Sequence, residues 1–140
     1  MKPAFIPDAS TLLKWVLPAA NEAFLQEAAA LRLAFVQGRI ELLVPGLWVY
    51  EVGNTLARRH PESAGQRLDA IRKLGMREIH PADAMIRQIL ELASRHKVTF
   101  YDAAYHALAI SQGGVFVTAD EKYLQAIGDQ PNARHIKDWV

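Results

Sequence analysis

Short strand-like runs alternate with stretches of helical periodicity along the whole chain. Strands are predicted at residues 4–7, 41–44, 76–79 and 115–117, with a final edge strand in the tail, residues 134–139. Helices are predicted at residues 10–17, 21–37, 47–59, 62–74, from 81 to beyond Ala93, 102–111 and 120–127. Asn21 is the expected cap of the second helix, and Gly38 is placed to end it.

This order of strands and helices predicts an α/β fold with a parallel sheet and helices on both faces. No linker, repeat or low-complexity segment interrupts the chain, so residues 1–140 are expected to form a single domain. In such sheets, ligands bind beyond the carboxyl ends of the strands. Residues that follow the strands directly are therefore the first candidates for a site.

Four carboxylates occur in mainly apolar surroundings near those ends. Asp8 and Asp120 follow predicted strands, while Glu51 and Asp102 lie in early turns of predicted helices. Ionised acids in apolar settings are costly unless something compensates them. If the fold gathers all four, a divalent cation bound by oxygen ligands would compensate their charge.

Each acid also has an ordinary structural explanation. Asp8, Asp102 and Asp120 could each cap a helix. Glu51 is the exception, because it lies inside a helix between Tyr50 and Val52. Four such acids in one chain favour a common site over four separate structural roles.

Three polar residues are candidates for supporting the acids. Ser10 and Thr118 carry hydroxyls beside them, and Asn54 shares the helix face of Glu51 and could orient its carboxylate. The alternative for Ser10 is a helix cap, and for Thr118 a strand residue of good β propensity. His106 follows Asp102 by one helical turn, but a satisfied structural histidine is the favoured interpretation.

Composition excludes several classes of protein. The chain has no cysteine, which removes disulfides, thiol nucleophiles and Cys-ligated zinc. Nucleotide-binding glycine motifs, an HExxH zinc motif and a GxSxG elbow are also absent. The net charge of +1 does not by itself indicate a nucleic-acid binder. With no secretory signal or membrane-spanning run visible, we expect a cytoplasmic protein without membrane contact.

Four short motifs together resemble the PIN-domain ribonucleases, and most closely the VapC-type toxins of toxin–antitoxin pairs. The motifs are Asp8-Ala9-Ser10, Tyr50-Glu51-Val52-Gly53-Asn54, Tyr101-Asp102-Ala103-Ala104-Tyr105 and Thr118-Ala119-Asp120. The resemblance implies a three-layer α/β/α domain with about five parallel strands. It also implies a catalytic quartet of Asp8, Glu51, Asp102 and Asp120 that binds Mg²⁺ or Mn²⁺, with Ser10, Asn54 and Thr118 at supporting positions. Members are usually homodimers, and toxins of this type are silenced by a cognate antitoxin protein.

The expected activity is metal-dependent endonucleolytic cleavage of single-stranded RNA. The alternative is a non-catalytic PIN-like module used for binding or dimerisation. A phosphoacceptor receiver domain is disfavoured, because Asp8 has no acidic neighbour. One departure from the family pattern is Pro7, which removes an N–H donor from a central strand immediately before Asp8.

Overall fold

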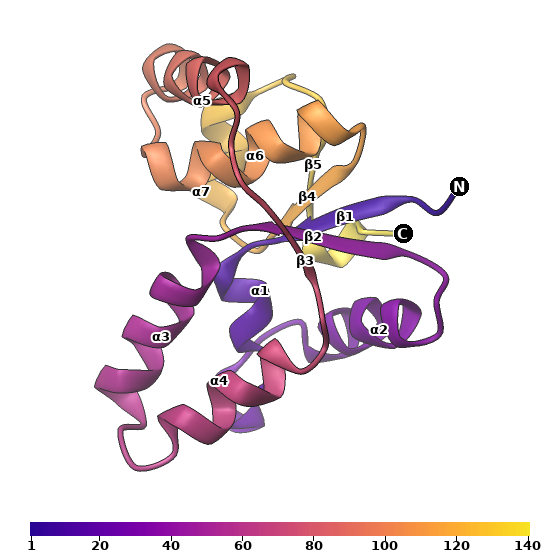
Figure 1. The fold of residues 1–140 in the computed structure, drawn as a ribbon, viewed down its shortest axis with the longest axis vertical. Helices are drawn as coiled ribbons and strands as arrows, with labels where there is room; N and C mark the ends of the chain where they lie inside the picture. Colours follow the sequence, from indigo (N-terminus) through magenta and orange to yellow (C-terminus); the bar gives the residue numbers. More distant parts are fainter.

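A five-stranded parallel sheet forms the centre of the computed structural model, which describes all of residues 1–140 (Figure 1). Its strands lie in the order β3-β2-β1-β4-β5, and every neighbouring pair is parallel. The strands are β1 (Ala4–Pro7), β2 (Glu41–Pro45), β3 (Arg77–Ile79), β4 (Val115–Thr118) and β5 (Ala133–His135). The expected parallel α/β fold is therefore confirmed.

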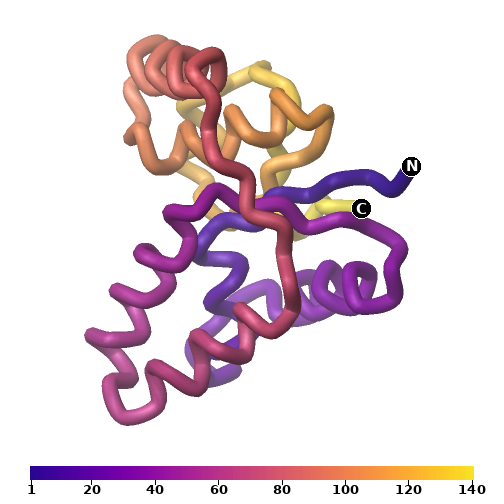
Figure 2. The backbone as a smooth tube through the Cα atoms, viewed as in Figure 1, coloured from indigo at the N-terminus to yellow at the C-terminus, as the bar shows by residue number.

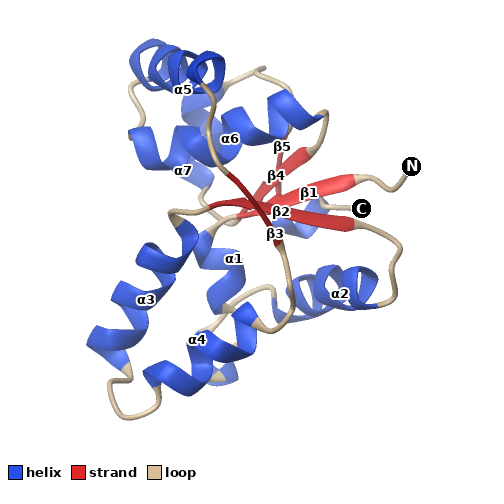
Figure 3. Cartoon of the chain, viewed as in Figure 1, coloured by secondary structure: helices blue, strands red, loops and turns tan.

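Helices cover both faces of the sheet and complete three layers (Figure 3). One layer holds α1 (Ala9–Leu13), α2 (Leu25–Val36), α3 (Trp48–Arg59) and α4 (Ala64–Arg72). The other holds α5 (Asp83–His96), α6 (Phe100–Gln112) and α7 (Glu121–Ile127). Two short 3₁₀ helices, η1 (Ala19–Asn21) and η2 (Ile136–Asp138), complete the elements. None of these helices is long and apolar enough to cross a membrane.

The path of the chain reverses once across the sheet (Figure 2). From β1 it moves outward to β2 and β3, with the connecting helices in one layer; it then crosses to β4 and β5 with helices in the other layer. The reversal lies between β1 and β4. In open α/β sheets a ligand-binding crevice opens at this switch point, beyond the carboxyl ends of the two strands.

Alternating strand residues pack on the two helical layers. Phe5, Leu42 and Val117 belong to a cluster with the buried face of α2, which includes Leu31. The neighbouring strand residues Ile6, Leu43 and Phe116 pack in a cluster that includes residues of α6. This alternation is the two-residue period of a strand buried on both faces. It fixes which side of each strand faces which layer.

Several predicted boundaries were wrong. Asn21 does not cap the second helix: it ends the 3₁₀ helix η1, and α2 begins only at Leu25. Phe24, with φ 58°, lies in the left-handed region directly before α2 and packs edge-on against His135. Contacts from across the molecule therefore override the local cap signal.

Other boundaries shifted by a few residues. The helix expected at 62–74 is limited to Ala64–Arg72, and α6 begins at Phe100, before Asp102. The tail forms the expected edge strand only at Ala133–His135 and then turns into η2. Helix ends of this kind are the least determined by periodicity alone.

Pro7 is accommodated in the central strand. Pairing of β1 with β4 continues to Pro7, whereas the register with β2 reaches only Phe5. The backbone N–H of Asp8 donates to the Val117 carbonyl at 3.2 Å. Because successive residues of a strand direct their N–H groups to opposite sides, the missing donor of Pro7 faces β2, where the pairing has already ended. The pairing that positions Asp8 is unaffected.

Gly114 is required by the close approach of β4 to β1. A Cβ atom at this buried position would lie 2.6 Å from the Ala4 carbonyl oxygen and 3.0 Å from Ile6 Cδ1. We predict that Gly114→Ala lowers the free energy of unfolding by about 2 kcal/mol or more, because the backbone must move. Denaturant unfolding measures this change. Gly53→Ala is the control: the site lies inside α3 with open space around it, so this variant should gain up to about 1 kcal/mol. An unchanged midpoint for Gly114→Ala would contradict the packing argument.

Candidate active site

The register of β1 and β4 brings the first and last candidate acids to one edge of the sheet. Pro7 is the partner of Val117, so Asp8 emerges beside Thr118, and Asp120 follows two residues later. Both strands end at the switch point. This register places Asp8 and Asp120 at the same edge of the sheet, as the expectation of a shared crevice requires.

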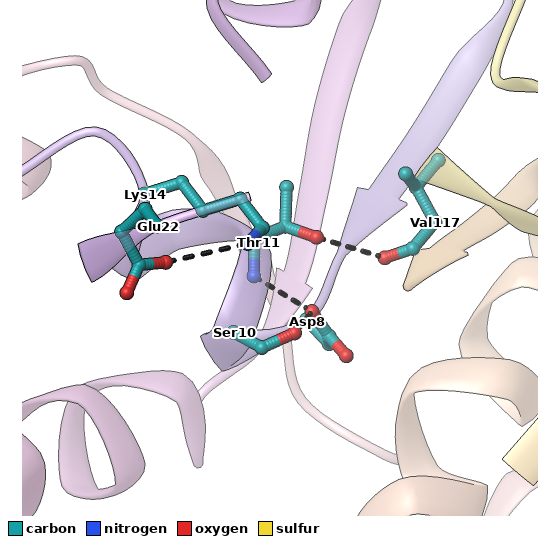
Figure 4. A network of polar contacts seen from close by, with 6 residues as sticks. All are labelled: Asp8, Ser10, Thr11, Lys14, Glu22 and Val117. Atoms are coloured by element: carbon teal, nitrogen blue, oxygen red, sulfur yellow. Dashed lines mark hydrogen bonds and ion pairs between the residues drawn. The ribbon is translucent and has the colours of Figure 1, made fainter. Parts of the chain in front are cut away.

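Asp8 is held by three hydrogen bonds to its carboxylate. Oδ1 accepts from the Ser10 hydroxyl at 2.7 Å and from the backbone N–H of Thr11 at 2.9 Å, as part of the N-cap of α1 (Figure 4). Oδ2 accepts from the Thr118 hydroxyl at 2.5 Å. The Thr11 hydroxyl in turn donates to the Val117 carbonyl, which ties the start of α1 to β4. Asp8 is thus a helix cap and, at the same time, a carboxylate in a fixed orientation.

Thr118 connects Asp8 to Asp120. Its hydroxyl donates to Asp8 and accepts the backbone N–H of Asp120 at 3.0 Å. Asp120 caps α7, because its Oδ1 accepts from the N–H of Tyr123 at 3.1 Å. Capping and a place at the site are therefore compatible roles for both aspartates.

Glu51 and Asp102 reach the same edge from the first turns of α3 and α6. Thr99, and not Asp102, caps α6, since its hydroxyl accepts the N–H of Asp102 at 3.0 Å. The half-buried Glu51 accepts a hydrogen bond at 2.7 Å from the hydroxyl of Tyr105, a buried residue of α6. This contact joins the two helical layers across the site.

The acids influence each other electrostatically. Burial raises the pKa of Glu51; the Tyr105 hydrogen bond opposes the shift, and the negative charges of Asp102 and Asp8 add to it. Burial likewise raises the pKa of Asp102, with further contributions from the charges of Asp120 and Asp8. Other members of the quartet are therefore close enough to Glu51 and to Asp102 to raise their pKa values.

No basic side chain compensates this charge. The ion pairs of the protein are Lys14–Glu22, Arg72–Asp69 and Arg95–Glu91, and none includes a member of the quartet. Lys14, although on the segment that follows α1, is occupied by Glu22 at 3.3 Å (Figure 4). The repulsion among the acids is left without a counter-charge from the protein.

The donors present fit a hard divalent cation. All are carboxylate oxygens without a basic partner, which is the donor chemistry that Mg²⁺ and Mn²⁺ prefer; Asp8, Glu51 and Asp102 are partly buried, and Asp120 is exposed. The side chains do not form a closed cluster of three or more metal-binding groups. Asp8 is held in place by its hydrogen bonds, so closing around an ion would require movement of the other acids.

The supporting residues are placed unequally. Ser10 and Thr118 hydrogen-bond to Asp8, as their positions suggested. The exposed Asn54 makes no hydrogen bond to Glu51; both line a hollow of about 370 Å³. Tyr105 takes the role expected of Asn54. The only sequence signal for it is its spacing from Asp102, which repeats the helical period.

His106 is a structural residue, as favoured by the sequence. It is fully buried, its Nε2 lies 2.7 Å from the Pro131 carbonyl, and its Nδ1 lies 2.7 Å from the Tyr123 hydroxyl. Because a carbonyl can only accept, Nε2 carries the proton and Nδ1 accepts from Tyr123. Burial lowers the pKa of His106, in agreement with a neutral ring.

A family model for the PIN domain matches residues 5–129. No curated protein matches the chain in sequence.

Three solved structures share the fold at low identity. PAE2754 from Pyrobaculum aerophilum is 23% identical, with a TM-score of 0.68 over 98% of this chain and 92% of that one. VapC20 of Mycobacterium tuberculosis, a toxin that cleaves the sarcin–ricin loop, is 20% identical, with a TM-score of 0.66 over 87% and 94%. VapBC2 from Rickettsia felis, bound to a DNA fragment from its promoter, is 13% identical, with a TM-score of 0.70 over 94% of this chain and 98% of that one.

The Tyr105 hydroxyl stabilises the ionised form of Glu51. We predict that Tyr105→Phe raises the pKa of Glu51 further, because the hydrogen bond to the carboxylate is lost. Carboxyl ¹³C shifts followed through a pH titration measure the change. Tyr123→Phe is the matched control, since that hydroxyl contacts His106 and not Glu51. Equal Glu51 titration in both variants would contradict the assigned role.

The raised pKa of Glu51 predicts a pH-dependent cost in stability. The folded state retains the Glu51 proton to higher pH than the unfolded state does. The stability that this protonated carboxyl contributes is therefore complete below the unfolded pKa and is lost as the pH rises through the folded pKa. Glu51→Gln should therefore raise the unfolding midpoint at neutral pH in EDTA and leave it unchanged in acid. Glu62→Gln, at an exposed residue, is the control and should have little effect at either pH. A Glu51→Gln variant that is less stable than the wild type at neutral pH would overturn the electrostatic argument.

Proposed function

This chain belongs to the PIN domain family, and on that premise we propose that it is a metal-dependent endoribonuclease that cleaves single-stranded RNA. The observation that carries the proposal is the gathering of Asp8, Glu51, Asp102 and Asp120, coupled in charge and without a basic partner, at the switch point of the sheet. Such an arrangement is costly for stability and is understandable if a cation completes it.

The acids at this site have different roles. Asp8 offers a carboxylate of fixed orientation, held by Ser10, Thr11 and Thr118. Glu51 and Asp102 project from two helical layers, and because their pKa values are raised, both would gain from a positive charge beside them. Mg²⁺ or Mn²⁺ bound by these acids would supply an activated water for in-line attack and would offset charge on the leaving oxygen.

A toxin of a toxin–antitoxin pair is the proposed biological context, with a cognate antitoxin as partner. The support is the likeness in fold to VapC20 and to VapBC2. A homodimer is proposed from the family resemblance, and Ile86 and Leu90, which expose apolar side chains on α5, support it. We place the activity in the cytoplasm, where RNA is available.

The rival is a PIN-like module that binds or dimerises without catalysis. Such a module has no need to keep four repelling acids together. Calorimetric titration with Mn²⁺ separates the two, since only the nuclease proposal requires a binding site that Asp8→Asn loses.

We predict that the purified protein cleaves structured RNA in single-stranded regions only when Mg²⁺ or Mn²⁺ is present. Asp8→Asn and Asp102→Asn should each lower the cleavage rate by on the order of 100-fold or more, because each removes a charged oxygen donor. Asp69→Asn is the matched control: Asp69 lies in an exposed pair with Arg72 on α4 and should not affect cleavage. Gel analysis of end-labelled RNA measures the rates. Equal cleavage by the wild type and the Asp8 and Asp102 variants would show a contaminating nuclease and overturn the proposal.

A further inference from the structure

Three aromatic side chains are exposed beside the acids. Tyr50 is 79% exposed, Tyr101 60% and Phe100 41%. Tyr50 directly precedes Glu51 in α3, and Tyr101 directly precedes Asp102 in α6. Exposed apolar groups that gather at one place mark an interaction surface. Here the surface adjoins the candidate active site.

These aromatics border a hollow that includes one of the acids. Glu51, Asn54, Tyr50, Tyr101 and Leu47 line a space of about 370 Å³. Leu47 and Tyr50 also line a neighbouring space of about 540 Å³, where most of the other lining side chains are apolar and Phe100 is one of them. The two spaces therefore adjoin at Tyr50. A ligand that enters the first has aromatic walls, an amide and a carboxylate within reach.

The charges of this surface select the part of a nucleotide that fits. Neither hollow is lined by Lys or Arg, and no cation pairs with Glu51. In the smaller hollow a phosphate would find no counter-charge and would face the Glu51 carboxylate; the larger hollow is lined by His80 and by a second carboxylate, Glu78. A nucleobase is uncharged and flat, and stacks on tyrosine faces regardless of its sequence identity. The Asn54 amide can donate to and accept from a base edge.

We propose that the hollow between Tyr50 and Tyr101 binds one unpaired nucleobase of a single-stranded RNA, next to the phosphodiester at the acids. This inference rests on the proposed nuclease function and adds a substrate feature to it. A base inside a duplex is stacked and paired, so its face cannot reach the two tyrosines. The hollow therefore gives a physical basis for a single-strand requirement that the acids alone do not supply.

The test measures binding of a short fluorescein-labelled single-stranded RNA by anisotropy in EDTA, where the strand stays intact. Tyr50→Ala and Tyr101→Ala should each weaken binding about 5- to 150-fold, through loss of stacking. Tyr50→Phe and Tyr101→Phe keep the ring and should bind as the wild type does. Leu33→Ala removes an exposed apolar side chain of α2 that lines neither hollow, and should have no effect.

A strand with an abasic nucleotide scanned along its length identifies the base itself. When the abasic nucleotide replaces the one whose base occupies the hollow, the strand should bind the wild type and Tyr50→Ala with equal affinity, because there is no base left to stack. The base site is overturned if the Ala variants bind intact RNA as tightly as the wild type does. It is equally overturned if the Phe variants lose as much RNA affinity as the Ala variants, or if the wild type does not bind the RNA. It is also overturned if the Ala variants change the mass in sedimentation while RNA affinity is unchanged, which would assign the hollow to a contact between copies of this chain.

The two proposals fail separately. If RNA is cleaved in an Asp8-dependent manner while Tyr50→Ala and Tyr101→Ala bind normally, the nuclease stands and the base site is wrong. If the wild type does not cleave RNA with Mn²⁺ but loses binding on removal of the tyrosine rings, the base site stands and the nuclease is wrong.

Discussion

The pairing of β1 with β4 is the constraint on which the site depends. Its register places Asp8 beside Thr118, and the Thr118 hydroxyl then bridges to both Asp8 and the backbone of Asp120. The same two strands form the switch point of the sheet, from which the helices leave on opposite faces. Helix α3 follows β2 and helix α6 precedes β4 in the opposite layer, so each can direct a carboxylate toward this edge from its own side. The close approach at Gly114 and the tolerance of Pro7 both follow from this pairing.

The charges gathered there work against the stability of the fold. Burial and mutual repulsion raise the pKa values of Glu51 and Asp102, so both ionised forms are disfavoured in the folded protein. Hydrogen bonds from Tyr105 to Glu51 and between Thr99 and Asp102 offset part of this rise. The hydroxyls of Ser10 and Thr118 donate to Asp8, and all of these partners are neutral. Neutral donors orient a carboxylate without cancelling its charge. A basic side chain would cancel the charge and also occupy the place that a divalent cation needs.

The sequence was sufficient for the fold class and for placing Asp8 and Asp120 after neighbouring strands, because both depend on strand ends and helical periodicity. It was insufficient where distant contacts decide. Asn21 has the chemistry of a cap, yet it ends η1, and α2 begins only after Phe24, which packs on the distant His135. Asn54 has the spacing to orient Glu51, but Tyr105 from another helix makes that contact. Two helices that are distant in sequence meet only in the folded molecule, so a hydrogen bond between them has no signature in the local sequence.

An anionic substrate approaching an anionic site raises the question of where binding energy originates. The net charge of the chain is only +1, and the quartet repels phosphate until a cation is bound. Contacts to the uncharged part of the nucleotide avoid this conflict, since stacking on Tyr50 and Tyr101 is insensitive to the charge state of Glu51 and Asp102. Binding of the base and binding of the cation then become separable contributions, one apolar and one electrostatic. On this view, stacking would keep the strand at the site, and cleavage would still depend on the charge that only a bound metal supplies.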